Sequence, residues 1–361
     1  MNPLREALVR WAREQGYPIA FSRPAILDLA RAEIEGRNRA GEFEPGFYRT
    51  VLAEAFSYPE DVELPRVTSV IVLAVPRPAH RLTFHLGGGP FQAVVPPTYA
   101  SYSEVPEVIR GEILAGPLRG GYGLRTLWAP LKNIAARLGL AAYGRNNITY
   151  APGFGSYHQL VCFVTEADLV SGAADPLKGT PGGAAASSPA LMCPECAGCD
   201  ACSRACPAGA IGHDRFLLHT ERCLTFMNEH HVPWPDWLPA SAHNAIIGCL
   251  ICQRACPLNR GLLRYEDLEP AFTLEETAAL LAGADGSGPL WRAVEEKSDA
   301  LGLPGLEDVA PRNLSALLLA PGPEGGGALR VEADSRVAAD SRVRTGGRVS
   351  ADSLEGGGIG G

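Results

Sequence analysis

Nine of the ten cysteines in this 361-residue chain lie between Cys193 and Cys256. The first motif is C-x2-C-x2-C-x3-C-P, and it consists of Cys196, Cys199, Cys202, Cys206 and Pro207. This spacing lets three cysteines hold one [4Fe–4S] cluster while the fourth reaches a second cluster. The sequence therefore predicts iron–sulfur chemistry, which transfers single electrons and provides no acid or base.

A second motif repeats the last part of the first. Cys249, Cys252 and Cys256 are followed by Pro257, and Ile246 stands where another cysteine would complete the repeat. The lone Cys223 between the motifs is available as the missing ligand, which gives eight thiolates for two clusters. By the crossed pattern of two-cluster proteins, the first cluster is assigned to Cys196, Cys199, Cys202 and Cys256, and the second to Cys206, Cys223, Cys249 and Cys252.

Two alternatives concern the metal and the register. Zinc sites also use C-x2-C pairs, but they need neither the triplet spacing nor the trailing proline. Cys193 lies three residues before Cys196 and competes with it by a register shift, but only Cys196 places Cys206 and its proline correctly. Cys162 lies in an apolar stretch and is expected to be a buried small hydrophobic residue.

The residues before the motifs predict a mixed domain of helices and strands over 1–170. Apolar residues spaced like Leu4, Leu8 and Trp11 predict a helix that ends near Gly16. Helices are also expected over 24–35 and 131–138. Strands are expected over 67–75 (buried on both faces), over 157–165, and as a pair around the glycines within 81–95. This order of elements favours an α+β or α/β domain.

The remaining residues divide by composition. Residues 171–190 have the composition of a linker, 191–265 form the cysteine domain, 266–320 form a short helical region, and 321–361 form a tail. Thr273 and Glu276 predict a capping box for a helix. The tail repeats ADSRV and has few apolar residues, so it is expected to be disordered.

The net charge of −8 argues against a broadly basic surface for nucleic acids. The first residues contain no apolar run of signal-peptide length, and no stretch approaches ~20 apolar residues. A cytoplasmic protein without a membrane segment is expected.

The cysteine layout, with its lone Cys223 and the second motif GCLICQRACPLNR, resembles that of the epoxyqueuosine reductases. The stretch LGLAAYGRNNITYAPGFGSYHQLVCFVTEADL, residues 138–169, is also similar to a block of that family. The two blocks cover about a third of the chain. The resemblance implies a nitroreductase-like, corrinoid-binding-type domain, followed by a ferredoxin-like double [4Fe–4S] module and a short helical region.

The resemblance also implies cofactors, partners and site residues. The cofactors would be two [4Fe–4S] clusters and cobalamin, and the electron donor would be reduced ferredoxin or flavodoxin. Gly155 and Ser156 would shape a turn next to the corrinoid loop, which would consist of Gly144, Arg145, Asn146 and Asn147. From the residues alone, the favoured interpretation of this loop is a turn rich in Gly and Asn that only reverses the chain.

Three departures from the family pattern bear on the reaction. Leu127 and Trp128 stand where the family has its proton-donating aspartate and a serine. A tyrosine and an aspartate before a histidine are also missing, and Tyr99, Tyr102 and Glu104 are what the matching stretch contains. The long helical repeats that help some members hold tRNA are absent, so tRNA binding is not expected.

The resulting expectation is an iron–sulfur oxidoreductase that reduces a corrinoid and then an unknown substrate other than epoxyqueuosine, because delivery of a proton to the leaving oxygen needs an acid. Tyr102 or Glu104 is a candidate replacement acid, against the simpler view that both lie in a surface loop. The alternative function is an electron-transfer protein that delivers electrons to a partner, such as a corrinoid protein.

Overall fold

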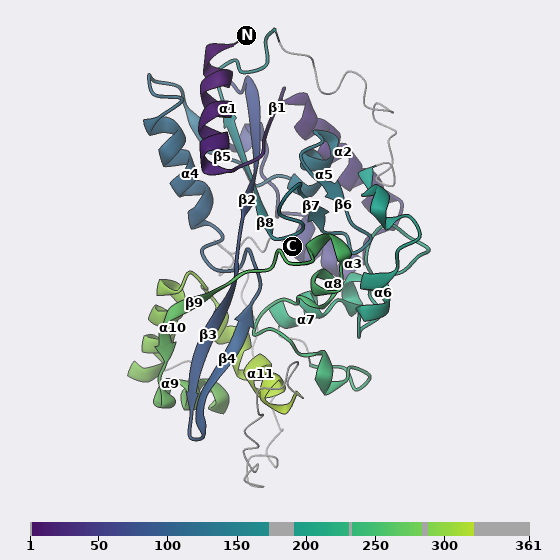
Figure 1. Ribbon diagram of the computed structural model, residues 1–361, viewed down its shortest axis with the longest axis vertical. Helices are drawn as coiled ribbons and strands as arrows, with labels where there is room; N and C mark the ends of the chain where they lie inside the picture. Colours follow the sequence, from purple (N-terminus) through teal and green to yellow (C-terminus); the bar gives the residue numbers. More distant parts are fainter. Residues whose placement is uncertain (1, 173–190, 231–232, 284–287, 321–361) are drawn as a thin grey trace.

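The computed structural model describes residues 2–172, 191–230, 233–283 and 288–320. Most of the expected linker (173–190) and the whole expected tail (321–361) lie outside the described residues. Figure 1 shows a central sheet with helices on both sides, a second sheet farther along the molecule, and the cysteine-bearing loops beside them. Within the described ranges, no helix is both long and apolar enough to cross a membrane.

The central sheet has four strands, and all neighbours in it are antiparallel. Strand β2 pairs with β8 along its full length, from Ser69 opposite Thr165 to Pro76 opposite His158. Seven of the eight residues of β2 are buried, which confirms the expected strand with two covered faces. In spatial order the strands are β1 (Ile19–Ser22), β2 (Ser69–Pro76), β8 (His158–Thr165) and β5 (Leu124–Thr126).

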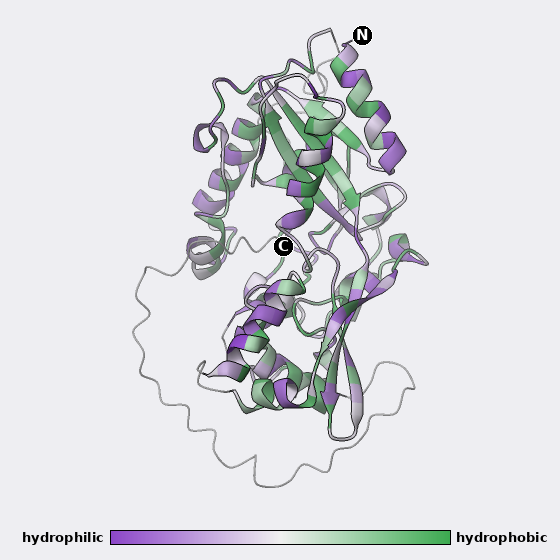
Figure 2. Ribbon diagram, turned by 90° about the vertical axis from the view of Figure 1, so that its left-hand side faces the viewer, coloured by the Kyte–Doolittle hydropathy of each residue, from purple (hydrophilic) through white to green (hydrophobic). Residues whose placement is uncertain are grey.

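Successive residues of β2 point to opposite faces of the sheet. Because both sets are apolar, helices cover both faces. Ile71 and Leu73 pack against α1 (Pro3–Gln15) and α4 (Glu104–Ala115). Val70 and Val72 pack against α2 (Ala25–Arg39) and α5 (Leu131–Arg137). Figure 2 shows these apolar strands enclosed between helices whose outer faces are hydrophilic. The sequence-based helices are confirmed, and α2 extends beyond its expected end.

A second sheet joins distant parts of the chain. Strands β3 (Ala79–Leu86) and β4 (Gly89–Val95) form the expected hairpin. Strand β9 (Tyr265–Phe272) pairs with β3 in parallel, with Ala79 opposite Tyr265. No sequence pattern predicted β9, because charged residues and a proline occupy a strand in which half of the residues are exposed. The hairpin and the C-terminal residues therefore share one sheet.

Three helices pack on that second sheet and form its core with residues such as Phe84 and Phe272, whose rings stack 5.0 Å apart. They are α9 (Leu274–Ala282), α10 (Pro289–Ala300) and α11 (Leu306–Leu319). The capping box of α9 is present: Thr273 Oγ1 accepts from the backbone N–H of Glu276, and the Glu276 carboxylate accepts from the backbone N–H of Thr273. The predicted mixture of helices and sheets is confirmed.

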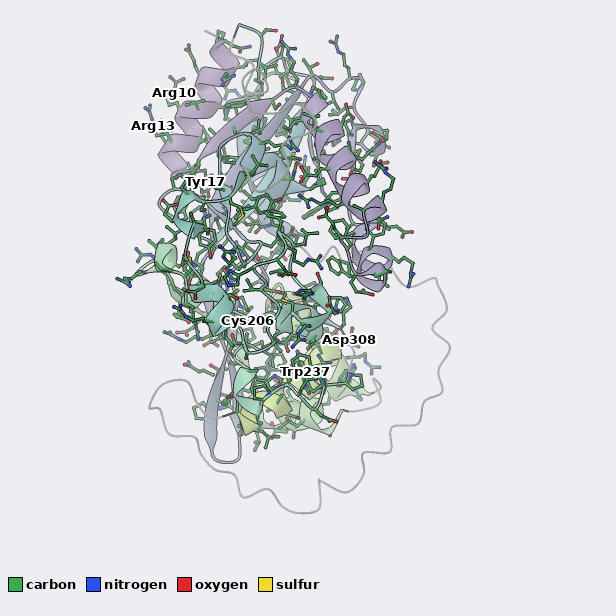
Figure 3. All side chains as sticks on the ribbon, turned by 90° about the vertical axis from the view of Figure 1, so that its right-hand side faces the viewer. Arg10, Arg13, Tyr17, Cys206, Trp237 and Asp308 are labelled. Carbon is green, nitrogen blue, oxygen red and sulfur yellow. The ribbon has the colours of Figure 1, made fainter. Side chains whose placement is uncertain are left out.

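The remaining elements are short. Three short helical turns lie between α2 and β2 in the chain. A two-stranded hairpin, β6–β7, lies between α5 and β8. They are α3 (Pro45–Phe47), η1 (Tyr48–Leu52), η2 (Pro59–Asp61), β6 (Ala142–Tyr143) and β7 (Thr149–Tyr150). Figure 3 places the labelled Cys206 between Tyr17, just after α1, and Asp308 in α11.

Candidate metal centre

The cysteines lie on short helical turns joined by loops. Pro257 begins a turn directly after Cys256, which suits proline because the first N–H of a helix has no partner inside the helix. Helix α6 packs against α8, so the two cysteine motifs are side by side. The turns are η4 (Pro194–Cys196), α6 (Ala201–Ala205), η5 (Thr220–Arg222), α7 (Leu224–Glu229), η6 (Ala240–Ala242), α8 (Ile251–Arg254) and η7 (Pro257–Asn259).

A first group of thiols draws on both motifs. Burial raises the pKa of Cys196, and the charges of Cys256 and Cys199 act in the same direction. Burial also raises the pKa of Cys202, with further contributions from Cys196 and Cys256. Cys256 of the second motif therefore lies near Cys196 and Cys202 of the first, and Cys199 lies near Cys196. We call Cys196, Cys199, Cys202 and Cys256 the first cysteine set.

A second group combines the lone cysteine with both motifs. Burial raises the pKa of Cys249 to about 11, and the charges of Cys223 and Cys206 raise it further. The pKa of Cys252 is raised well above its ordinary value, first by burial and then by the charges of Cys249, Cys223 and Cys206. We call Cys206, Cys223, Cys249 and Cys252 the second cysteine set. The assignment of each cysteine to a cluster stays a prediction, with which this grouping agrees.

The chemistry of the two sets fits iron–sulfur clusters. Buried thiols with raised pKa values give up their protons when a metal replaces them. N–H groups also point at sulfur: the backbone N–H of Ala210 donates to Cys206 Sγ at 3.4 Å, and Asn244 Nδ2 donates to Cys249 Sγ at 3.3 Å. Among the described residues, no three His, Cys, Asp or Glu side chains gather round a point that suits one metal ion. A cluster instead presents a separate iron atom to each thiolate.

Two cysteines lie outside these sets. Cys162 is 1% exposed in β8, and burial raises its pKa to about 12, as expected for a thiol in the apolar core. Cys193 is also buried, and its Sγ approaches the carbonyl oxygen of Ala142 at 3.7 Å. The charges of Cys196 and Cys256 act on Cys193, so this thiol lies beside the first cysteine set.

The loop expected to approach a corrinoid connects β6 to β7, and one of its residues holds the first cysteine set. The guanidinium of Arg145 donates to the carbonyl oxygens of Cys196 and Cys199, each at 3.0 Å. Gly144 is required by close packing, because a Cβ there would lie 2.4 Å from a ring carbon of Tyr150. These contacts fix the loop against the cysteine-bearing segment.

In the other half of this loop, one buried side-chain donor lacks a hydrogen-bond partner. Asn146 is 1% exposed and donates to the Tyr150 hydroxyl at 3.0 Å. Asn147 has a left-handed backbone with φ of +58°, and its buried Nδ2 has no hydrogen-bond partner. Lys132 Nζ donates to the carbonyl oxygen of Asn147 at 3.4 Å. An unpaired buried donor suits a ligand with an acceptor oxygen, so these residues fit a polar group of a corrinoid, and their role in binding one stays a prediction.

No sequence pattern pointed to Lys132 as a site residue. It is the second residue of α5, in which residues 133–137 are buried, and burial lowers the pKa of its ammonium to about 8. The charge of Cys223 opposes this shift, which places the lysine near the second cysteine set.

The next turn along the chain is clamped to the cysteine motifs. The backbone N–H of Ser156 donates to Asn259 Oδ1 at 2.8 Å, and Asn259 Nδ2 donates to Ser156 Oγ at 2.7 Å. Gly155 has φ of +58°, and a Cβ there would lie 2.1 Å from Asn259 Oδ1. Gly155 and Ser156 therefore position the end of the second motif.

The position of the family's acid is part of the apolar core. Leu127 is 1% exposed, packs among the residues between the sheet and α2 and α5, and donates its backbone N–H to the carbonyl oxygen of Cys162 at 3.0 Å. Tyr102 packs on Trp128 with ring centroids 5.3 Å apart, and burial raises the pKa of Tyr102 to about 12. Glu104 is exposed at the start of α4. Tyr102 is thus half-buried, whereas Glu104 is exposed, and a role for either as an acid stays a prediction.

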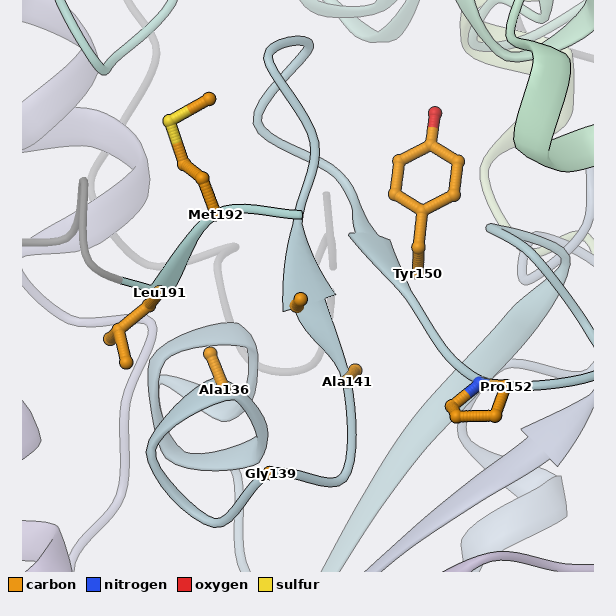
Figure 4. Close-up of a pocket in the computed structure, with 8 residues that line it drawn as sticks. Ala136, Gly139, Ala141, Tyr150, Pro152, Leu191 and Met192 are labelled. Atoms are coloured by element: carbon orange, nitrogen blue, oxygen red, sulfur yellow. The ribbon is translucent and has the colours of Figure 1, made fainter. Parts of the chain in front are cut away.

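Two small cavities lie beside the β6–β7 hairpin and its loop. One, of about 270 Å³, is shown in Figure 4 and is lined by residues such as Tyr150, Leu191 and Met192. The other, of about 260 Å³, is lined by Arg145, Met192 and residues 213–216. Both fall below the ~300 Å³ at the lower end of small-molecule sites, so neither has room for a corrinoid.

Comparisons with known proteins agree with the cysteine geometry. The family model described as "4Fe-4S double cluster binding domain" matches residues 195–259. This match defines the class: the chain contains a domain that binds two [4Fe–4S] clusters.

The relatives narrow this class. The epoxyqueuosine reductase of Pseudomonas aeruginosa is 27% identical over 259 residues, which cover 70% of this chain and 61% of that protein. That of Staphylococcus aureus is 28% identical over 156 residues, which cover 41% and 35%. Over four curated epoxyqueuosine reductases, the matched residues span between 28% and 61% of the relative's length.

Solved structures show the same fold. The epoxyqueuosine reductase of Streptococcus thermophilus matches with a TM-score of 0.59 and 18% identity over 88% of this chain and 81% of that one. A structure of epoxyqueuosine reductase with a modified tRNA stem loop matches with a TM-score of 0.55 and 19% identity over 87% and 80%. Together these findings support an epoxyqueuosine reductase-like family for this chain, as the motifs predicted.

Proposed function

We propose that this protein is an iron–sulfur oxidoreductase whose two cysteine sets hold two [4Fe–4S] clusters and whose β6–β7 loop adjoins a corrinoid. The observation that carries the proposal is the separation of eight thiols into two sets of four, each with members from different motifs. The double-cluster family match over residues 195–259 supports it. A reduced ferredoxin or flavodoxin would supply the electrons.

A bound corrinoid would supply two-electron reducing chemistry, which iron–sulfur clusters alone lack. The residues proposed to hold its polar groups are Asn147, with its unpaired Nδ2, and Lys132, whose ammonium faces the same loop. The proposed task of Arg145 is to keep the first cysteine set in contact with this loop.

The proposed substrate is not epoxyqueuosine. Opening an epoxide by reduction needs a proton for the leaving oxygen, and the side chain of Leu127 is an alkyl group in the core. For the same reason we do not extend to this chain the tRNA stem loop named with the related structure. We expect the gene to fail to restore queuosine in a strain that lacks epoxyqueuosine reductase.

The alternative function is electron transfer to a partner, such as a corrinoid protein, without a substrate site in this chain. Leu127 in the core and the small volume of both cavities favour this alternative.

One experiment separates the two functions. The full chain is purified without oxygen, its iron, sulfide, zinc and cobalt are quantified, and its absorption spectrum is recorded with and without added hydroxocobalamin. We expect about eight irons per chain from eight thiolate ligands, together with a spectral shift on binding of the corrinoid. Zinc without iron would overturn both functions, and eight irons without corrinoid binding would leave the electron carrier.

A further inference from the structure

A half-buried carboxyl is connected through Tyr99 to the second cysteine set. Glu229 is the last residue of α7, six positions after Cys223. The hydroxyl of Tyr99, which follows β4, donates a hydrogen bond to Glu229 Oε1. Burial raises the pKa of Glu229 to about 7, while the hydrogen bond from Tyr99 acts in the opposite direction. The pair therefore joins the second sheet to the cysteine-bearing segment through a carboxyl that can exchange a proton near neutral pH.

Tyr99 connects this carboxyl to the backbone that carries the second cysteine set. Gly248 precedes Cys249 and has φ of +66°, and a Cβ added there would lie 2.4 Å from the hydroxyl oxygen of Tyr99. The tyrosine thus lies directly on this glycine. Burial and the Glu229 carboxylate raise the pKa of Tyr99, and the charges of Cys223 and Cys249 act in the same direction, so the tyrosine lies near these two thiols.

Hydrogen bonds fix both Gly248 and the end of α7, the two segments that Tyr99 contacts. Asn228 Nδ2 donates to the carbonyl oxygen of Gly248 at 2.5 Å, and Asn313 of α11 donates to the carbonyl oxygen of Asn228 at 2.9 Å. Arg312 donates to the carbonyl oxygens of Met227 and His230 at 2.7 and 2.8 Å. The titratable and charged groups around α7 and the second set are Tyr99, Cys223, Cys249, His230, Arg312 and Lys132.

We propose that Glu229, hydrogen-bonded to Tyr99, takes up one proton for each electron that enters the second cysteine set. The inference rests on the proposed function, because the electron would come from a reduced ferredoxin or flavodoxin and would be held by the cluster that these thiolates bind. One electron arrives and one proton passes from a hydronium ion or buffer acid in the solvent to a Glu229 carboxylate oxygen. One O–H bond breaks in the solvent acid, one forms on the carboxylate, and the net charge of the region does not change.

The physical reason is electrostatic. An added negative charge in a poorly solvated region makes ionisation of a nearby carboxyl less favourable. Glu229 has a pKa of about 7, so near neutral pH a small further rise in its pKa converts the carboxylate to the protonated acid. Uptake of the proton then lowers the electrostatic cost of placing the electron there.

The test is a redox titration followed by electron paramagnetic resonance, carried out on the cluster-loaded full chain at several pH values around neutral. We expect the midpoint potential of one cluster to fall as pH rises, with a slope of one proton per electron, while the other stays nearly constant. Glu229→Gln should abolish the slope, and its amide oxygen can still accept the hydrogen bond from Tyr99.

Two further variants sharpen the result. Tyr99→Phe removes a hydrogen bond that lowers the pKa of Glu229, so the sloping range should move to higher pH without losing its slope. Glu221→Gln is the matched control, because this carboxylate is exposed although it lies closer to Cys223 in sequence; its titration should match the wild type. An infrared difference spectrum between reduced and oxidised protein should show a protonated-carboxyl band that Glu229→Gln removes.

The outcomes distinguish this inference from the proposed function. A protein that takes up no iron–sulfur cluster would overturn the proposed function and the inference with it. A protein with two clusters whose potentials do not depend on pH would overturn the inference alone, as would an unchanged slope in Glu229→Gln.

Discussion

The central sheet and the cysteine-bearing loops are built in different ways. In the sheet, β2 and β8 are buried on both faces, and burial of apolar side chains holds the layers together. In the loops, the longest helix has six residues, and Arg145, Asn259, Asn313 and Arg312 bind backbone carbonyls or N–H groups. Apolar burial therefore stabilises the sheet, whereas the loops depend on polar clamps and, as proposed, on metal.

The largest expected effect removes a ligand from the loops. Cys252→Ser should lower the iron content from about eight to about four atoms per chain, because one cluster loses a thiolate. Cys162→Ser, in the sheet, is the matched control and should keep all the iron. Iron and sulfide analysis after anaerobic reconstitution measures this. Equal iron loss in both variants would contradict the assignment of iron binding to the loop cysteines and not to Cys162 in the sheet.

The next effect concerns the sheet. Leu127→Asp should lower the free energy of unfolding by about 4 kcal/mol, because it removes buried methyl groups and places a carboxyl in the apolar core. Arg125→Asp introduces the same group at an exposed position two residues away and should cost less than about 0.5 kcal/mol. Urea unfolding measures both. A stable Leu127→Asp protein would show that this part of the core opens to water.

A pH effect distinguishes the loops from the sheet. The folded-state pKa of Glu229 is raised to about 7 from an ordinary value of 4.5, so the folded state binds more protons between these values. The free energy of unfolding should therefore fall by about 3 kcal/mol as pH rises through this range and slightly above it.

Urea unfolding of the cluster-loaded protein at a series of pH values checks this prediction. Glu229→Gln should lose this component of the pH dependence, and the exposed Glu221→Gln should retain it. Identical pH profiles for wild type and Glu229→Gln would contradict the prediction.

The smallest effect concerns one clamp. Arg145→Gln should cost about 2 kcal/mol, because two charged hydrogen bonds to the carbonyl oxygens of Cys196 and Cys199 are lost. It should also speed iron release to a chelator. Arg204→Gln is the control: this arginine is exposed and forms an ion pair with Asp200 at the surface, where such pairs contribute little. Equal rates of release would mean that Arg145 is not a clamp.

Much of the fold was predictable from local patterns. The strands within 67–75, 81–95 and 157–165 were found because their apolar or alternating residues reflect how each strand is buried. The capping box at Thr273 was found because both partners are three residues apart. Strand β9 was missed because it exists only through pairing with β3, almost two hundred residues earlier in the chain.

The candidate site divides in the same way. The cysteine spacing predicted a double cluster because short loops reach several iron atoms only at particular separations, and the family match over residues 195–259 agrees. Lys132, Tyr99 and Glu229 carried no such signal. Their pKa values depend on burial and on neighbours from other elements, and neither is encoded in adjacent residues.

The sequence by itself therefore predicted the double-cluster chemistry, which the family match supports. The tertiary structure decided that Leu127 belongs to the core, that Arg145 holds the first cysteine set, and that a carboxyl with a pKa near neutral lies close to the second. The reason is physical: ligand spacing is a property of a short segment, whereas burial and charge–charge interaction depend on which distant segments fold against each other.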